Sequence, residues 1–93
     1  MTPEGAVKKK VKALLKEAGA YYVMPVTGGY GNSGAPDFIV CHKGIFLGIE
    51  CKAGTNQATA LQLSNLDAIS RCGGVAMVVR EKDIDHLREF LTK

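Results

Sequence analysis

The segment 45–52, IFLGIECK, constrains the fold of this chain more than any other stretch. Its pattern predicts a strand, in which successive side chains point to opposite faces. Glu50 and Lys52 share one face, about 7 Å apart along the strand. The opposite face carries only side chains that suit a core: Ile45, Leu47, Ile49 and Cys51. The chain must bury that second face. A surface ion pair would by itself explain the two charges on the first face. Evidence for a functional role must therefore come from other residues.

Apolar patterns along the rest of the chain predict an α/β domain with the order α-β-β-β-α-β-α. Thr2 and Pro3 mark the start of a first helix, and Gly19 marks its end. The unbroken apolar run VAMVV predicts a strand buried on both faces, and Asp83 is expected to cap the last helix. The other expected elements are strands over 21–26 and 37–41, a tight turn at Gly44, a helix over 59–72, and an end of the last helix near Leu91. Together they predict a central mixed sheet flanked by helices.

The length of 93 residues and a hydrophobic content of 46% predict one soluble domain over residues 1–93. No apolar run approaches the roughly 20 residues of a membrane span, and the N-terminus does not have the pattern of a signal peptide. The three cysteines lack C-x-x-C spacing, which fits reduced thiols and argues against a zinc site. We therefore expect a cytoplasmic protein with no membrane partner.

Gly29, Gly31 and Gly34 match G-x-G-x-x-G, a pattern that binds dinucleotides where it follows a strand and opens a helix. Here Pro36 and the strand-forming FIVC follow, so no helix begins after the glycines. We therefore expect no nucleotide cofactor. The glycines instead predict a loop that can approach a bulky partner and that leads to Asp37.

Two helices carry a polar residue in line with their apolar stripes. Gln62 lies four and seven residues before Leu66 and Ile69, so it points toward the same interior. Glu4 extends the stripe of the first helix in the same way. Burying such groups costs free energy unless they meet polar partners. Purely structural roles are also open to two of the acids, because Glu4 suits the positive end of a helix dipole and Asp37 suits a turn after proline.

These polar residues could converge on one site with the charges of strand 45–52. Two carboxylates on adjacent strands, Asp37 and Glu50, form with water an oxygen-rich site that suits Mg²⁺ or Mn²⁺. Such an ion can polarise a phosphoryl group and activate water. The ammonium of Lys52 would add positive charge where the transition state gathers negative charge.

The spacing of Pro36-Asp37, twelve further residues and Glu50-Cys51-Lys52 resembles the P-D…(D/E)-x-K nuclease signature. The segments GNSGAPDFIV and GIECKAG, with a glutamate in the first helix and a glutamine ten residues after the lysine, extend the likeness over nearly the whole chain. The chain resembles a VRR-NUC domain, a small branch of these nucleases related to Holliday junction resolvases, in the stand-alone form found in bacteriophages and bacteria. The resemblance implies a single-domain PD-(D/E)XK nuclease fold of the α/β class.

By this resemblance, Asp37 and Glu50 are metal ligands, and the backbone carbonyl of Cys51 completes the set. Lys52 would orient or activate the attacking water. The family usually carries a β-branched residue or leucine at position 51, but that side chain faces the core and only its carbonyl would contact the metal. Two further residues would support the metal or its waters: Gln62 and Glu4.

DNA is the partner that the resemblance implies, and the first helix carries a cluster of lysines. Such a cluster is most often a solvated helix face, but it is also how proteins contact a phosphate backbone. The residues expected to contact DNA are Lys8, Lys9 and Lys12 in the first helix and Gly31, Asn32 and Ser33 in the glycine loop.

The sequence thus predicts a DNA endonuclease that uses Mg²⁺ or Mn²⁺ and acts as a homodimer on branched DNA. A two-fold dimer would supply two sites whose symmetry matches that of a four-way junction. The alternative is a non-catalytic nucleic-acid-binding module built on the basic helix, and a partner protein could supply specificity. His42 and His86 show no spacing to the carboxylates that suggests a shared site, and we expect both at the surface.

Overall fold

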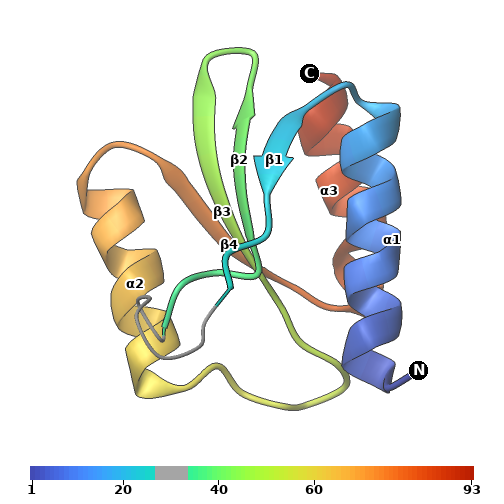
Figure 1. Ribbon diagram of the computed structural model, residues 1–93, viewed down its shortest axis with the longest axis vertical. Coiled ribbons are helices and arrows are strands. Elements are labelled where there is room, and N and C mark those ends of the chain that lie inside the picture. The colour runs from blue at the N-terminus through green and yellow to red at the C-terminus, as the bar shows by residue number, and fades with distance from the viewer. Residues whose placement is uncertain (27–33) are drawn as a thin grey trace.

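The computed structural model describes residues 1–26 and 34–93, and its centre is a sheet with the strand order β1-β2-β3-β4 (Figure 1). The strands are β1 (Tyr21–Val23), β2 (Phe38–His42), β3 (Ile45–Cys51) and β4 (Val75–Val79). Neighbouring strands among β1, β2 and β3 are antiparallel, whereas β4 runs parallel to β3. This mixed sheet confirms the predicted fold class.

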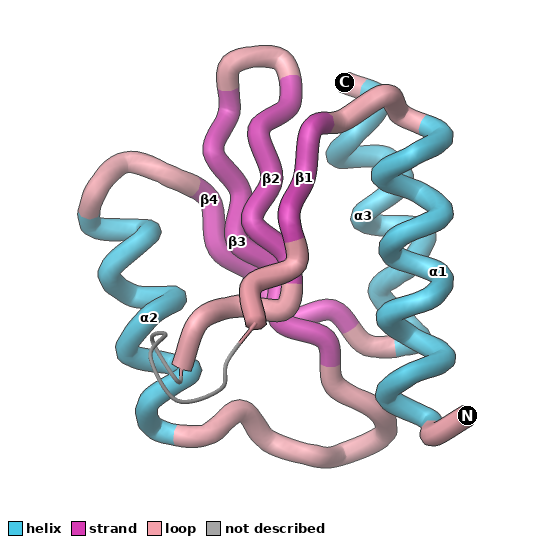
Figure 2. The backbone as a smooth tube through the Cα atoms, in the orientation of Figure 1, coloured by secondary structure: helices cyan, strands magenta, loops and turns pink. Residues whose placement is uncertain are grey.

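Helices lie on both sides of the sheet (Figure 2). α1 (Pro3–Glu17) and α3 (Ile84–Thr92) pack together on one side, and α2 (Ala60–Arg71) lies on the other. A short 3₁₀ turn, η1 (Glu81–Asp83), precedes α3. α1 begins as predicted, because the hydroxyl of Thr2 accepts a hydrogen bond of 3.0 Å from the N–H of Gly5. Within the described residues, none of the helices combines the length and apolar character needed to cross a membrane.

The main core lies between the sheet and the helix pair α1 and α3. Alternate residues of β2 and β3 point into it, as the period-two pattern predicts. The opposite face of the end of β3, which carries Glu50, therefore lies toward α2. The buried core residues are Val7, Val11, Leu14, Leu15, Phe38, Val40, Leu47, Ile49, Cys51, Val79, Leu87 and Leu91.

A tight turn at Lys43 and Gly44 joins β2 to β3 and fixes their register. The two residues have φ angles of 52° and 79°, the pair of positive values that a two-residue hairpin turn requires. Phe38 is consequently paired with Ile49. The residue that precedes β2 thus comes to the same edge of the sheet as the end of β3.

The strands differ from the prediction in three details. β4 forms an edge of the sheet, so only Val79 of this strand is fully buried and the prediction of burial on both faces is wrong. Ile45, expected in the core, is 42% exposed because it lies beside the hairpin turn. β1 ends at Val23, short of the expected residue 26, and Pro25 beyond it has no N–H for a sheet ladder.

Two side chains make contacts other than those predicted. Asp83 does not cap α3, since its carboxylate accepts a hydrogen bond of 2.9 Å from the N–H of Arg80 and closes η1. His42 is half-buried rather than at the surface, and its Nε2 lies 2.8 Å from the carbonyl oxygen of Leu91. That contact links β2 to α3. His86 is exposed, as predicted.

Gly34 lies where the chain passes close to α2 before it enters β2. A Cβ atom at this position would be 2.6 Å from the carbonyl oxygen of Leu61 and 2.5 Å from Nδ2 of Asn65. The carbonyl belongs to a helix and cannot move aside cheaply. Only glycine therefore allows the segment that leads to Asp37 to lie this close to α2.

We expect Gly34→Ala to lower the free energy of unfolding by about 1–3 kcal/mol, because the added methyl group must push the segment away from α2. Thermal and urea denaturation would measure this loss. A variant that unfolds at the same temperature and urea concentration as the wild type would contradict the close approach.

Candidate active site

Asp37 and Glu50 meet at one edge of the sheet, where β2 begins and β3 ends. Because Phe38 pairs with Ile49, Asp37 and Glu50 follow at the next position across the ladder. Asp37 is held there, since its Oδ2 accepts a hydrogen bond of 2.8 Å from the backbone N–H of Cys51. The structure thus brings together the two carboxylates that the sequence singled out.

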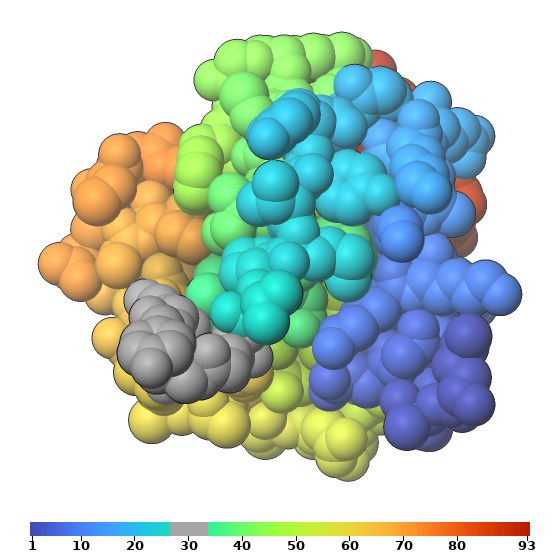
Figure 3. Space-filling view, viewed as in Figure 1, coloured from blue at the N-terminus to red at the C-terminus, as the bar shows by residue number. Residues whose placement is uncertain are grey.

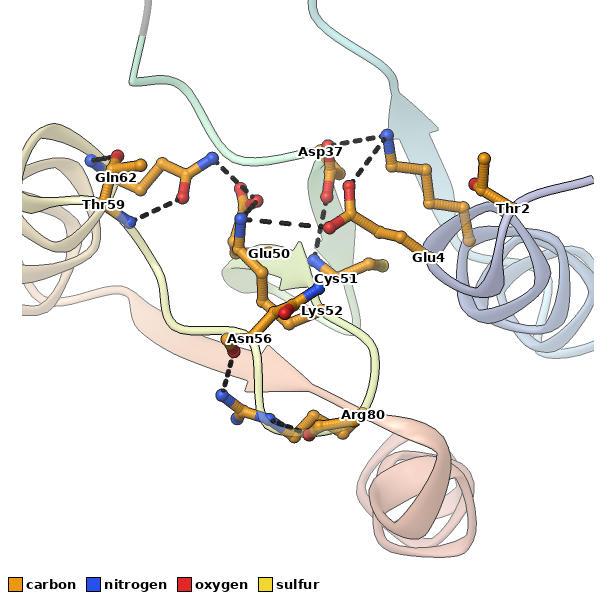
Figure 4. A network of polar contacts seen from close by, with 12 residues as sticks. Thr2, Glu4, Asp37, Glu50, Cys51, Lys52, Asn56, Thr59, Gln62 and Arg80 are labelled. Carbon is orange, nitrogen blue, oxygen red and sulfur yellow. Dashed lines mark hydrogen bonds and ion pairs between the residues drawn. The ribbon is translucent and has the colours of Figure 1, made fainter.

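Glu50 is a buried carboxylate, with 1% of its surface exposed. Its Oε2 accepts a hydrogen bond of 3.0 Å from Nε2 of Gln62 and lies 3.6 Å from Nζ of Lys52 (Figure 4). Its Oε1 is also buried and has no hydrogen-bond partner among the described residues. A buried acceptor without a partner is costly, so this atom is suited to bind a cation or a water molecule.

The surroundings of Glu50 favour its protonated form. Burial raises the pKa of Glu50 from an ordinary value of 4.5 to about 7, and the negative charge of Asp37 adds to the rise. The ammonium of Lys52 acts in the opposite direction but does not cancel it. A divalent cation beside this carboxylate would favour the ionised form instead.

α1 adds two charged side chains to the site, Glu4 and Lys8. Oε1 of Glu4 lies 3.9 Å from Nζ of Lys52, and Oε2 of Glu4 lies 3.7 Å from Nζ of Lys8. Nζ of Lys8 is in addition 3.3 Å from Oδ1 of Asp37. Glu4 therefore faces the site, as its place in the helical stripe indicates, and Lys8 joins it there.

Gln62 reaches the site from the first turn of α2, and its amide group has a fixed orientation. Its Oε1 accepts a hydrogen bond of 2.9 Å from the N–H of Thr59, whose hydroxyl accepts one of 3.2 Å from the N–H of Gln62. This reciprocal pair is a capping box. Because the amide oxygen is engaged in the cap, the amide nitrogen is the group that faces Glu50.

The oxygen atoms at this edge suit a hard divalent cation. Asp37, Glu50 and the backbone carbonyl of Cys51 are the ligand set that the resemblance implies, and the unpaired Oε1 of Glu50 fits that assignment. Within the described residues, no group of three or more His, Cys, Asp or Glu side chains could hold a metal ion. Water or a substrate phosphate would have to complete the coordination. The thiol of Cys51 is unsuited as a ligand, because burial raises its pKa to about 12.

Comparisons with known proteins show which solved structures this chain is similar to. No family model and no curated protein matches the chain. A solved structure described as a VRR_NUC domain matches it with a TM-score of 0.82 and 28% sequence identity, over 96% of this chain and 97% of the other. Over nearly its whole length the chain is therefore similar in fold to a VRR_NUC domain. It also shares its fold with Archaeoglobus fulgidus Hjc, a Holliday junction resolvase, at a TM-score of 0.62 and 20% identity, over 82% of this chain and 66% of the resolvase.

The residues predicted to contact DNA occupy different places in the structure. Lys9 and Lys12 are exposed on α1, where a phosphate backbone could reach them. Lys8 turns toward the carboxylates of the site. The three loop residues lie outside the described part of the chain: Gly31, Asn32 and Ser33.

Arg80 and Glu81 form a clamp on the loop that follows Lys52, and sequence reasoning missed both. Nε of Arg80 donates to the carbonyl oxygen of Gly54 at 3.1 Å, and Nη2 donates to that of Asn56 at 2.7 Å. The carboxylate of Glu81 accepts a hydrogen bond of 3.1 Å from the N–H of Gly54. Only their position directly after a predicted strand could have drawn attention to them, because their partners lie more than twenty residues earlier.

The raised pKa of Glu50 makes the stability of the metal-free protein depend on pH. A carboxyl group with a folded-state pKa near 7 stabilises the fold fully below pH 4.5, and this contribution is lost as the pH rises through 7. We expect the wild type to lose roughly 3 kcal/mol of stability from this group between pH 4.5 and 8. Glu50→Gln should lack that loss and should melt at a higher temperature than the wild type at pH 8.

Thermal melts in EDTA at pH 5 and pH 8 would test the expectation, because the chelator removes any bound metal. The comparison of the two proteins at each pH cancels the titration of groups that do not interact with Glu50. Parallel pH dependences for wild type and Glu50→Gln would show that Glu50 ionises freely in the folded protein.

Proposed function

We propose that this protein is a VRR-NUC-type DNA endonuclease that uses Mg²⁺ or Mn²⁺ and hydrolyses phosphodiester bonds by direct attack of water. The observation that carries the proposal is the buried carboxylate of Glu50, whose Oε1 is unpaired among the described residues at the edge shared with Asp37. A purely structural acid would not be expected to leave a buried oxygen without a partner. The fold shared with a VRR_NUC domain supports the same assignment.

The side chains around the carboxylates have distinct tasks in this reaction. A divalent cation held by Asp37, Glu50 and the carbonyl of Cys51 would polarise the phosphodiester and acidify a water molecule. Lys52 keeps an ammonium group 3.6 Å from Glu50, where it can orient the attacking water and stabilise charge on the phosphate. Gln62 fixes the rotamer of Glu50 through its hydrogen bond, so the ligand oxygen is oriented before substrate arrives.

Affinity for DNA should come mainly from the exposed lysines of α1 rather than from the carboxylates. Lys9 and Lys12 are exposed on the same helix that contributes Glu4 and Lys8 to the site. A DNA backbone lying along α1 would therefore reach the carboxylates of the site near the first turns of this helix. Binding that depends on lysine-phosphate contacts weakens steeply with salt.

We expect Asp37→Ala, Glu50→Ala and Lys52→Ala each to reduce cleavage at least about a hundredfold, because each removes charge that stabilises the transition state. DNA binding should remain within a few-fold of the wild type. Nicking of plasmid DNA with Mg²⁺ or Mn²⁺ measures the first effect, and fluorescence anisotropy with labelled DNA measures the second. Lys12→Ala is the matched control, since it should weaken binding and leave the metal site intact.

Near wild-type cleavage by any of the three site variants would show that the site is wrongly assigned. A wild type that binds DNA but cuts no substrate with either cation would favour a non-catalytic nucleic-acid-binding module.

We further propose that the domain acts as a homodimer on branched DNA. One chain measures 33 × 31 × 20 Å and offers one site, so paired cuts in two strands need a second copy. Apolar side chains exposed on β1 and just after it supply a surface for that copy. Figure 3 shows the cyan segment around residues 21–26 at the surface, and its exposed apolar side chains are Tyr21, Val23, Met24 and Val26. Val26 is 86% exposed, and a cluster of this kind is typical of protein contacts.

Light scattering should give about twice the 9.9 kDa mass of one chain at micromolar concentration. Val23→Lys should shift the mass to that of a monomer, because it places a charge in the apolar cluster, while the circular dichroism spectrum stays unchanged. A wild-type mass of 9.9 kDa would rule out the dimer. Equal cleavage rates on plain duplex and four-way junction would rule out the preference for branched DNA.

A further inference from the structure

Lys8 differs from its neighbours on α1 in where its ammonium group lies. Lys9, Lys10 and Lys12 are exposed, whereas the Lys8 side chain is 36% exposed and bends to the site. Its Nζ lies 3.3 Å from Oδ1 of Asp37 and 3.7 Å from Oε2 of Glu4. Lys8 therefore occupies a position between two carboxylates of the proposed metal site.

The ammonium of Lys8 and a metal ion would compete for the same carboxylate. Oδ2 of Asp37 already accepts the N–H of Cys51, and Oδ1 faces Lys8. The ammonium group of Lys8 therefore lies beside the oxygen atoms that a cation would use, and two cations this close repel each other.

Glu4 offers Lys8 a second partner on the same helix. The two residues are four positions apart, with the acid on the N-terminal side, which is the favourable order for an ion pair within a helix. If Lys8 left Asp37, its ammonium could stay with Glu4.

We propose that Lys8 is a positioning residue that acts as an internal counter-ion: it holds the carboxylate of Asp37 in the metal-free protein and gives up that place to a divalent cation. This inference rests on the proposed function, because it requires a cation at Asp37 and Glu50. It adds that Lys8 lowers the affinity of the site for a divalent cation. Occupancy would then depend on the cation concentration, since each binding event must displace an ammonium group.

The test measures metal binding without DNA. Lys8→Met removes the charge and keeps an unbranched side chain that suits a helix, so it should bind Mn²⁺ about fivefold more tightly, as expected when a competing, partly exposed ion pair is removed. Lys8→Arg keeps the charge and should bind Mn²⁺ no more tightly than the wild type. Lys12→Met makes the same change one turn further along, at an exposed position, and should stay within about twofold of the wild type because solvent and salt screen its charge. Isothermal titration calorimetry with Mn²⁺ alone gives all four affinities, and melting curves in EDTA check that each variant is folded.

A second measurement leaves the sequence unchanged. Two-dimensional NMR of the lysine side chains in the wild type should show the Lys8 signal moving during a titration with Mg²⁺, while the Lys12 signal stays in place. This readout stands even if Lys8→Met does not fold.

The outcomes separate this inference from the proposed function. Wild-type binding of Mn²⁺ with equal affinities for Lys8→Met and Lys12→Met, or a Lys8 signal that Mg²⁺ does not move, would overturn the role of Lys8 and leave the nuclease proposal intact. A wild type that neither binds Mn²⁺ nor cleaves DNA would overturn both.

Discussion

The pairing of β2 with β3 is the constraint on which the rest of the structure depends. The hairpin turn fixes a register in which Phe38 lies opposite Ile49, and that register alone brings Asp37 beside Glu50. A slip of one residue would turn Glu50 into the hydrophobic core and carry apolar side chains out to α2. The hydrogen bond from the N–H of Cys51 to Asp37 then locks the same register from the side of the site. The same strand register therefore determines both the fold and the position of the site.

The surroundings of Glu50 are unfavourable for its ionised form, and residues from separate parts of the chain hold the site in place. The buried carboxyl of Glu50 resists ionisation, yet Gln62 and Lys52 both orient groups toward its Oε2. The glutamine is fixed by the cap of α2, and the lysine precedes a loop that the Arg80 side chain holds by two carbonyl groups. These buried polar and charged groups make the free energy of unfolding smaller than apolar packing at the same positions would. Such a loss of stability is common where a protein maintains a reactive site.

Local periodicity explains why so much of this arrangement could be predicted. The alternation in 45–52 assigns Glu50 and Lys52 to one face whatever the sheet order is, and the helical spacing of Gln62 turns it inward before any partner is known. The edge position of β4 could not be read in this way, because an apolar run looks the same in a central and an edge strand. The contacts of Arg80 could not be predicted either. A long flexible side chain can reach partners far away in the sequence, and such contacts produce no periodic pattern.

The position of Lys8 in the candidate active site could not be predicted from the sequence either. Five lysines in the first helix look alike as a basic cluster, and from the sequence Lys8 is predicted to contact DNA in the same way as Lys9 and Lys12. The helix, however, is anchored by a buried stripe that includes Val7 and Val11, and this anchor turns the residue next to Val7 toward the end of β3. Three carboxylates and two ammonium groups then share the site, from Glu4, Asp37, Glu50, Lys8 and Lys52. With all of them ionised the site carries one net negative charge, which a single divalent cation overcompensates, so displacement of Lys8 from Asp37 is the change that would relieve the excess positive charge.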